Sequence, residues 1–194
     1  RGIHAEDMPN YIPTMNGRTY YTFRVGCVWG FLLDCGEGKD DSSVESGGTI
    51  CFHQFRLRET EFIKDVIANA QNEYAAEGVT HKLVISHIGF TYKDKYPFDI
   101  EEELYREWAK LMRDHIQPDL LLYGHHHKVE ISKIGSDFDT YGQPCTAIVG
   151  SKPIFDRENG NGFVGCALTL MENGKKRVVF NDNKGEILAD EIID

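Results

Sequence analysis

The segment 120–127 (LLLYGHHH) constrains this chain more than any other stretch. A short apolar run bounded by a turn residue predicts a buried strand, and Gly124 lets the backbone leave that strand in a conformation that a residue with a side chain would resist. If the histidines stay extended, His125 and His127 face one side and His126 the other. Two imidazoles that converge at the end of a strand indicate a transition-metal site. The alternative is a solvated polar loop with a chance cluster of histidines.

The middle of the chain alternates between strand and helix patterns. Apolar residues at helical spacing predict helices over 59–76 and 101–116, and short apolar runs predict strands over 82–86 and 120–122. This order is typical of an α/β fold with neighbouring parallel strands. Ligand sites in such sheets gather at the carboxyl ends of the strands, where His87 follows one strand and the three histidines follow the next.

The two ends of the chain are rich in strand patterns. Residues 20–25 and 27–34 predict a hairpin whose second strand is buried on both faces, and a polar, Gly-rich loop (34–48) follows it. Five further strands are expected over 129–133, 146–150, 163–171, 177–180 and 186–192. Asn173-Gly174 predicts a tight hairpin turn between two of them.

Composition limits the partners and the compartment. The chain has 194 residues, of which 41% are hydrophobic, so it can form one ordinary domain with a core. A net charge of -10 argues against nucleic acid or an anionic membrane as the main partner, and no apolar run is long enough to span a bilayer. Five cysteines without CxxC spacing indicate free, small core residues, which, with an N-terminus unlike a signal peptide, favours a cytoplasmic location. The histidines outside the two motifs are expected on the surface.

Two motifs in this order resemble a known family. A strand that ends in SHIGF (86–90), followed by a strand that ends in YGHHH (123–127), resembles the C-terminal half of the calcineurin-like metallophosphoesterases. The segments 20–23 and 31–37 resemble the paired strands that follow the family's Gly-Asn-His-Glu motif, and the likeness is closest to the purple-acid-phosphatase-like branch. The resemblance implies a sandwich of two sheets flanked by helices.

The resemblance also implies a site. The family holds two metal ions, which clamp the phosphoryl group and activate a water. Carried over by position, His87 and His125 would bind the second metal, His127 would bind the first, and His126 would bind neither. The metals would be zinc, manganese or iron, and the substrate a phosphoester of undetermined kind. This chain lacks the family's Asp-x-His, Gly-Asp-x-x-Asp and Asn-His-Glu motifs, which supply the carboxylate ligands and the acid–base histidine.

These observations give the expected identity of the chain. We expect residues 1–194 to be a single domain, the C-terminal lobe of a calcineurin-like phosphoesterase domain, with a mixed sheet and helices on one face. The missing motifs would lie upstream, so the whole protein would be a metal-dependent phosphoesterase and this chain alone would be inactive, because two cations about 4 Å apart need bridging carboxylates. Asp34 follows a strand but occupies a structural position rather than that of the bridging ligand.

Two other functions remain open at this stage. The chain could be a non-catalytic association module with vestigial histidines; lacking one of the two sheets, it would expose an apolar face and self-associate or bind its missing half. It could also be a mononuclear zinc hydrolase that uses His87, His125 and His127, although no general base is evident for it.

Overall fold

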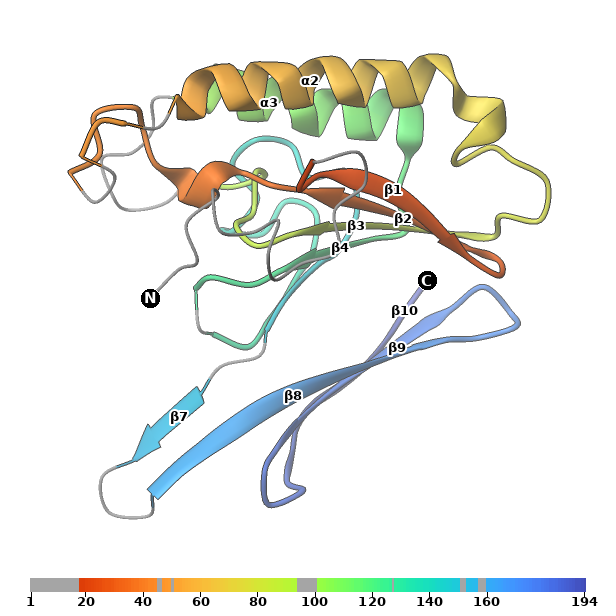
Figure 1. Ribbon diagram of the computed structural model, residues 1–194. Helices are drawn as coiled ribbons and strands as arrows, with labels where there is room; N and C mark the ends of the chain where they lie inside the picture. The colour runs from red at the N-terminus through yellow and green to blue at the C-terminus, as the bar shows by residue number, and fades with distance from the viewer. Residues whose placement is uncertain are drawn as a thin grey trace.

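The computed structural model describes residues 18–44, 47–49, 51–93, 101–126, 128–150, 153–156 and 160–194. Two helices lie above a six-stranded sheet, and a second, four-stranded sheet extends below it (Figure 1). The fold is therefore mixed α/β with helices on one face of a mixed sheet, as the sequence predicted. None of the described helices is long and apolar enough to cross a membrane.

The six-stranded sheet has the order β1-β2-β3-β4-β6-β5. Its four central strands β2, β3, β4 and β6 are parallel, and the edge strands β1 and β5 are antiparallel to their neighbours. The predicted parallel arrangement and the predicted N-terminal hairpin are both confirmed. The strands are β1 (Tyr21–Val25), β2 (Val28–Leu33), β3 (His81–Ser86), β4 (Leu120–Tyr123), β5 (Glu130–Ser132) and β6 (Ala147–Val149).

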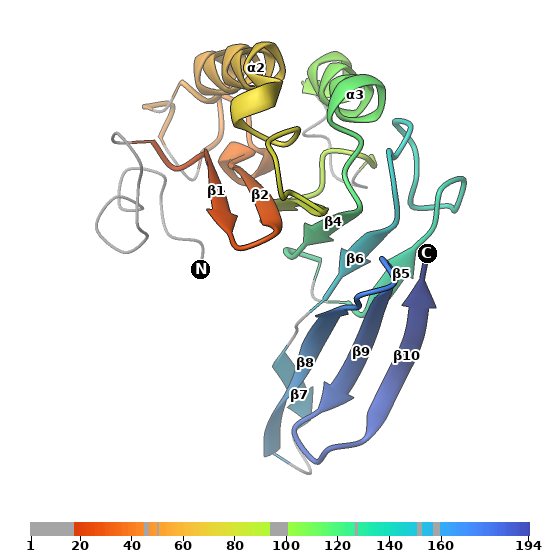
Figure 2. The same ribbon diagram turned by 90° about the vertical axis from the view of Figure 1, so that its right-hand side faces the viewer.

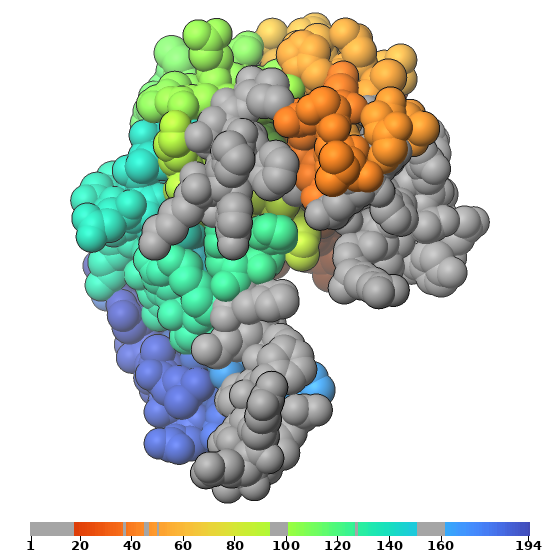
Figure 3. Space-filling model, turned by 90° about the vertical axis from the view of Figure 1, so that its left-hand side faces the viewer, coloured from red at the N-terminus to blue at the C-terminus, as the bar shows by residue number. Residues whose placement is uncertain are grey.

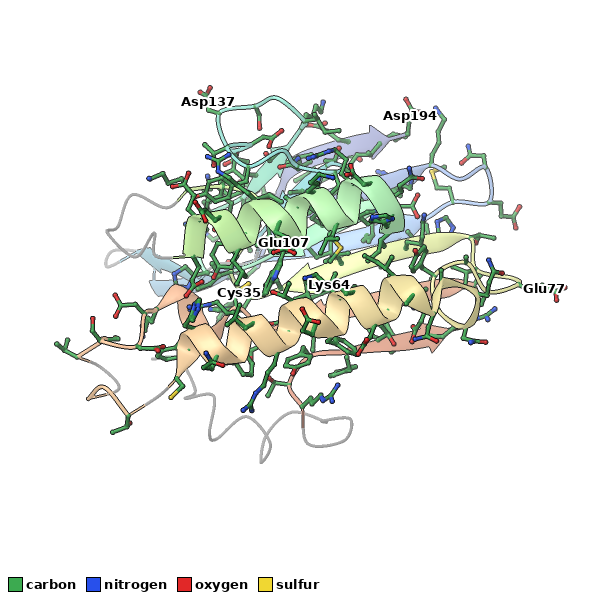
Figure 4. All side chains as sticks on the ribbon, turned by 90° about the horizontal axis from the view of Figure 1, so that it is seen from above. Cys35, Lys64, Glu77, Glu107, Asp137 and Asp194 are labelled. Carbon is green, nitrogen blue, oxygen red and sulfur yellow. The ribbon has the colours of Figure 1, made fainter. Side chains whose placement is uncertain are left out.

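The helices α2 (Phe52–Ala68) and α3 (Glu102–Leu111) cover one face of this sheet side by side (Figure 2). Trp108 of α3 is fully buried between the helices and the sheet, and its indole N–H donates to the hydroxyl of Thr60 on α2 at 2.7 Å. Lys64 and Glu107 pair across the exposed side of the two helices at 3.1 Å (Figure 4). The helices are thus joined both in the core and at the surface.

The predicted start of the first helix was wrong by seven residues. Helix α2 begins at Phe52 rather than at Glu59, and it ends at Ala68 rather than at the predicted Ala76, with the short helix η2 (Ala70–Asn72) after it. Its first two turns bury Arg56, a charged residue that interrupts the apolar spacing by which a helix is recognised. The second helix is as predicted, except that its last turn, η4 (Met112–Ile116), is a single π-helical turn.

The four-stranded sheet packs on the opposite face of the six-stranded sheet. Its antiparallel order is β10-β9-β8-β7, and Val164, Val178 and Phe180 meet Leu83 and Ile148 in a second core cluster. In Figure 3 this sheet (blue) projects below the rest of the molecule. Its strands are β7 (Pro153–Asp156), β8 (Gly160–Leu170), β9 (Lys176–Asp182) and β10 (Ile187–Ile193).

This second sheet corrects the expectation that the chain lacks one of the family's two sheets. Successive hairpins over 153–193 bring alternating apolar residues onto one face, so this segment builds a sheet by itself. Strand β7 was not predicted, whereas the turn at Asn173-Gly174 joins β8 to β9 as expected, with Gly174 at φ +82°.

The cysteines and one histidine differ in part from expectation. All five cysteines are free, as predicted, but Cys27, Cys51 and Cys166 are exposed rather than in the core. Two of these cysteines are exposed because of their position, since Cys27 lies in the β1–β2 turn and Cys51 precedes α2. His81 at the start of β3 is buried, contrary to its expected place on the surface.

Candidate metal centre

The carboxyl ends of the four parallel strands lie in register. Leu33 of β2 pairs with Ser86 of β3, Ser86 with Tyr123 of β4, and Tyr123 with Val149 of β6. The residues that follow these strands, among them Asp34, His87 and Gly124, therefore lie along one edge of the sheet. This is the edge at which the sequence predicted the site.

His87 and His125 face each other at this edge. The Nε2 atom of His87 lies 3.3 Å from the Nδ1 atom of His125, and the two rings meet at nearly a right angle. Both residues are exposed. Two nitrogen ligands at about 2.0–2.1 Å from a tetrahedral zinc ion lie about 3.3 Å apart. The observed separation therefore allows one ion to bind both imidazoles, as it also allows a hydrogen bond between them.

The turn after β4 is tighter than predicted. His125 has φ +62°, and the His126 N–H donates to the Gly124 carbonyl at 2.7 Å, so the histidines do not continue the strand as extended residues. The left-handed residue is His125 and not Gly124. A β-carbon on Gly124 would lie 3.4 Å from the His87 carbonyl oxygen, which is an ordinary contact, and the Gly124 N–H donates to that oxygen at 3.0 Å, so a backbone hydrogen bond joins the two loops. Left-handed backbone on a non-glycine residue costs about 1–2 kcal/mol and is often found at functional sites.

His126 takes a different direction from the facing pair. Its ring packs against Tyr92, with centroids 4.6 Å apart, and against Phe138 at 5.9 Å. Its ring also contacts the His125 ring, with centroids 5.4 Å apart, so the exclusion of His126 from the ligand set stays a prediction. His127 lies outside the described residues. Among those that are described, no group of three or more His, Cys, Asp and Glu side chains is placed to hold a metal ion.

Asp34 has a structural role, in agreement with its exclusion from the ligand set. Its carboxylate accepts from the Thr19 hydroxyl at 2.6 Å and from the Gly36 N–H at 3.0 Å. Its own N–H donates to Glu59 of α2 at 2.6 Å. Asp34 therefore fixes the loop after β2, including the short helix η1 (Gly36–Gly38), against the helix.

Residues that the sequence did not single out hold the loop of His87. The Ser86 hydroxyl donates to the Ile88 carbonyl at 2.7 Å, and the Cys35 thiol lies 3.1 Å from the same hydroxyl. Burial raises the pKa of the Cys35 thiol far above its ordinary value, so the group stays protonated and is no nucleophile. The sequence signal for this support is slight, since Ser86 and Cys35 resemble ordinary small residues at strand ends.

Gly89 also supports the loop of His87, and a substitution at this position tests how closely the loop is packed. A β-carbon at this position would lie 2.2 Å from the Tyr92 ring and 2.7 Å from the Tyr123 ring. Gly89→Ala is therefore expected to lower the free energy of unfolding by about 1–3 kcal/mol, measured by urea denaturation. Gly165→Ala is the control, because no atom of the described part of the chain lies within 4 Å of its added β-carbon. Equal stability of the Gly89 variant and wild type would contradict the packing.

Comparisons with known proteins give a fold but no family. The sequence matches no protein-family profile, and no curated protein matches it. Among solved structures, a purple acid phosphatase from yellow lupin (Lupinus luteus) seeds is similar, with a TM-score of 0.54 and 15% sequence identity. The match covers 94% of this chain and 34% of the lupin enzyme, so the chain spans about a third of that protein's length. At this identity the likeness shows that this chain shares the fold of that part of the lupin protein.

Proposed function

We propose that this chain is the C-terminal lobe of a dinuclear metallophosphoesterase, to which it contributes histidine ligands, and that alone it is inactive. The observation that carries this proposal is the 3.3 Å separation of the His87 and His125 ring nitrogens at the carboxyl edge of a parallel sheet. A fold shared with part of a purple acid phosphatase supports the same assignment.

The residues present fit a metal site of this kind. Two imidazole nitrogens at the separation that tetrahedral zinc requires would hold one ion, and His127 would hold the other. When bound, the two ions would lower the pKa of a water and stabilise the oxygens around phosphorus. In this chain, the turn at His125 and the Ser86–Ile88 hydrogen bond hold the facing imidazoles in place, while carboxylate ligands and the acid–base group would come from an upstream segment.

Metal titration of the isolated chain tests the ligand set. We expect His87→Ala and His125→Ala each to weaken zinc binding, measured by calorimetry, by more than roughly 100-fold, since a single imidazole would remain. His115→Ala is the control, because His115 is exposed on η4, away from the strand ends. His127→Ala is expected to leave the single ion bound, whereas a mononuclear three-histidine site would lose affinity. Unchanged zinc binding by His125→Ala would favour vestigial histidines.

Hydrolysis tests the rest of the proposal. With added manganese or zinc, this chain should show no turnover of para-nitrophenyl phosphate, and a version extended through the upstream coding sequence should be active. Robust turnover by the short chain would contradict the proposal. A short chain that is active but loses activity on His127→Ala would instead support the mononuclear zinc hydrolase.

A further inference from the structure

A histidine and a buried glutamate are in contact where the two helices begin. The Nδ1 atom of His53, in the first turn of α2, lies 2.8 Å from the Oε1 atom of Glu101, the residue directly before α3. The Glu101 side chain is 5% exposed, whereas that of His53 is 50% exposed. The His53 N–H also donates to the Asp41 carboxylate at 2.9 Å, which fixes the start of the helix. The pair therefore joins a buried acid to an accessible imidazole.

Arg56 holds the carboxylate of this pair from the other side. Its guanidinium lies 3.4 Å from the same Oε1 atom of Glu101. Arg56 is fully buried and donates to backbone carbonyls of the loop that follows β2, so its own position is fixed. An arginine does not lose its proton in a protein, so the carboxylate has a permanent positive partner. Glu101 is therefore held in place as the hydrogen-bond acceptor that faces His53.

This contact determines which ring nitrogen of His53 carries the proton. An ionised carboxylate accepts hydrogen bonds and cannot donate them, so Nδ1 is the donor. The other nitrogen, Nε2, makes no hydrogen bond with the described residues. A neutral ring offers a lone pair at Nε2, and a charged ring offers a proton there. An imidazole that a carboxylate orients in this way is typical of general acids and bases.

The pair lies at the end of the molecule that carries His87 and His125. Helix α2 follows β2, and α3 follows β3 and the loop of His87, so both helices begin at the carboxyl edge of the sheet. The loop after β2 touches the loop of His87, because a β-carbon on Gly38 would lie 3.2 Å from the Ile88 side chain. Figure 3 looks onto this end, where the loop after β2 and the first turns of α2 (orange) and the segment after β4 (green to teal) both reach the surface.

We propose that His53, positioned by Glu101, is a general acid that protonates the leaving oxygen of the phosphoester. This inference rests on the proposed function. As the attacking oxygen bonds to phosphorus, the bond to the leaving oxygen breaks, and the charged imidazole gives its Nε2 proton to that oxygen. The ring becomes neutral and regains a proton from solvent. The upstream acid–base group would then polarise the phosphoryl group, while His53 serves the leaving group.

The proposal names a class of substrate. An alkoxide is strongly basic and leaves phosphorus readily only when it is protonated, whereas para-nitrophenolate is a stable anion that needs no proton. A general acid is therefore required for phosphoesters of aliphatic alcohols, and we assign these as the substrates that His53 serves.

Two phosphoesters test this role in the chain extended through the upstream coding sequence. His53→Ala should lower kcat for glycerol 2-phosphate by about 10²–10⁴-fold and kcat for para-nitrophenyl phosphate by less than about threefold. Glu101→Gln retains an acceptor for Nδ1 but loses the charge, so it should lower kcat for the glycerol ester alone, by roughly tenfold. His115→Ala is the control, because His115 is exposed on η4, and both rates should be unchanged.

Nitrogen NMR of the isolated chain in EDTA tests the contact between His53 and Glu101 apart from metal and activity. At a pH where the rings are neutral, His53 should carry its proton on Nδ1, as the hydrogen bond to Glu101 requires. The exposed His115 should instead show the Nε2-protonated form that free imidazole side chains favour. A His53 proton on Nε2 would overturn the proposal.

The kinetic outcomes separate this inference from the proposed function. If His53→Ala slows both esters equally, or slows neither, His53 is not the general acid, although the metal-dependent activity stands. If the extended chain hydrolyses neither ester, the proposed function fails and this inference fails with it. The isolated His53→Ala chain should bind zinc like wild type, and a loss of zinc would make His53 a ligand instead. Circular dichroism confirms that each variant is folded.

Discussion

Replacing Arg56 with methionine is expected to lower the free energy of unfolding by about 3–5 kcal/mol. Arg56 is fully buried on α2. Its guanidinium donates to the carbonyl oxygens of Cys35 at 3.0 Å, of Gly36 at 3.4 Å and of Lys39. It also lies 3.4 Å from the Glu101 carboxylate, which is 5% exposed. Methionine would fill most of the volume but remove these hydrogen bonds and leave the buried carboxylate without its arginine.

Urea denaturation measures this loss, with Arg58→Met as the control. Arg58 lies on the same helix but is exposed, so its replacement should change stability by less than about 0.5 kcal/mol. The double variant Arg56→Met with Glu101→Leu should recover part of the loss, because the unpaired charge is then removed with its partner. A single-variant loss below about 1 kcal/mol would show that His53, whose Nδ1 lies 2.8 Å from Glu101, is a sufficient partner.

The parts of the fold that could be predicted follow from apolar periodicity. Strands such as Leu120–Tyr123 are short apolar runs between turn residues, and their order with the helices determines a parallel sheet. The contact between His87 and His125 could be predicted from this sheet, because residues that follow aligned parallel strands lie at the same edge of the sheet. The metal ligands and the second ion stay predictions, since His127 lies outside the described residues.

The parts that could not be predicted depend on exceptions to this pattern. Arg56 is charged yet buried, so it concealed the first two turns of α2, and Glu59 is buried where the helix was predicted to start. The left-handed backbone at His125 is equally invisible in the sequence, where the glycine beside it is the residue expected to adopt it. Both exceptions are set by tertiary contacts: carbonyls of the 35–39 loop bind Arg56, and the His87 loop approaches Gly124.

Glu59 is the more unusual of the two buried charges. It is fully buried, its Oε1 atom accepts the Asp34 N–H at 2.6 Å, and its Oε2 atom has no hydrogen-bond partner among the described residues. Burial raises the pKa of this carboxyl well above its ordinary value of 4.5; the Asp34 N–H opposes the rise, the nearby Asp34 carboxylate adds to it, and Arg56 opposes it. The folded chain therefore retains a proton on Glu59 at pH values where the unfolded chain releases it.

This difference gives the stability a definite dependence on pH. Above pH 4.5 the folded state binds more protons at Glu59 than the unfolded state, so stability falls by about 1.4 kcal/mol per pH unit until the folded carboxyl ionises. The stability that the protonated Glu59 contributes is fully present below the unfolded pKa, and it is lost as the pH rises through the folded pKa. Glu59→Gln mimics the protonated acid and cannot ionise, so it should remove this fall.

Urea denaturation of wild type and Glu59→Gln between pH 4 and 9 measures the effect. The two proteins should have similar stability near pH 4.5, and the variant should become increasingly more stable as the pH rises. Glu61→Gln is the control, because that side chain is 71% exposed on the same helix, and its stability should remain parallel to that of wild type. If Glu59→Gln instead lost stability at every pH, the carboxylate would be ionised in the folded chain and Arg56 would act as its counter-ion.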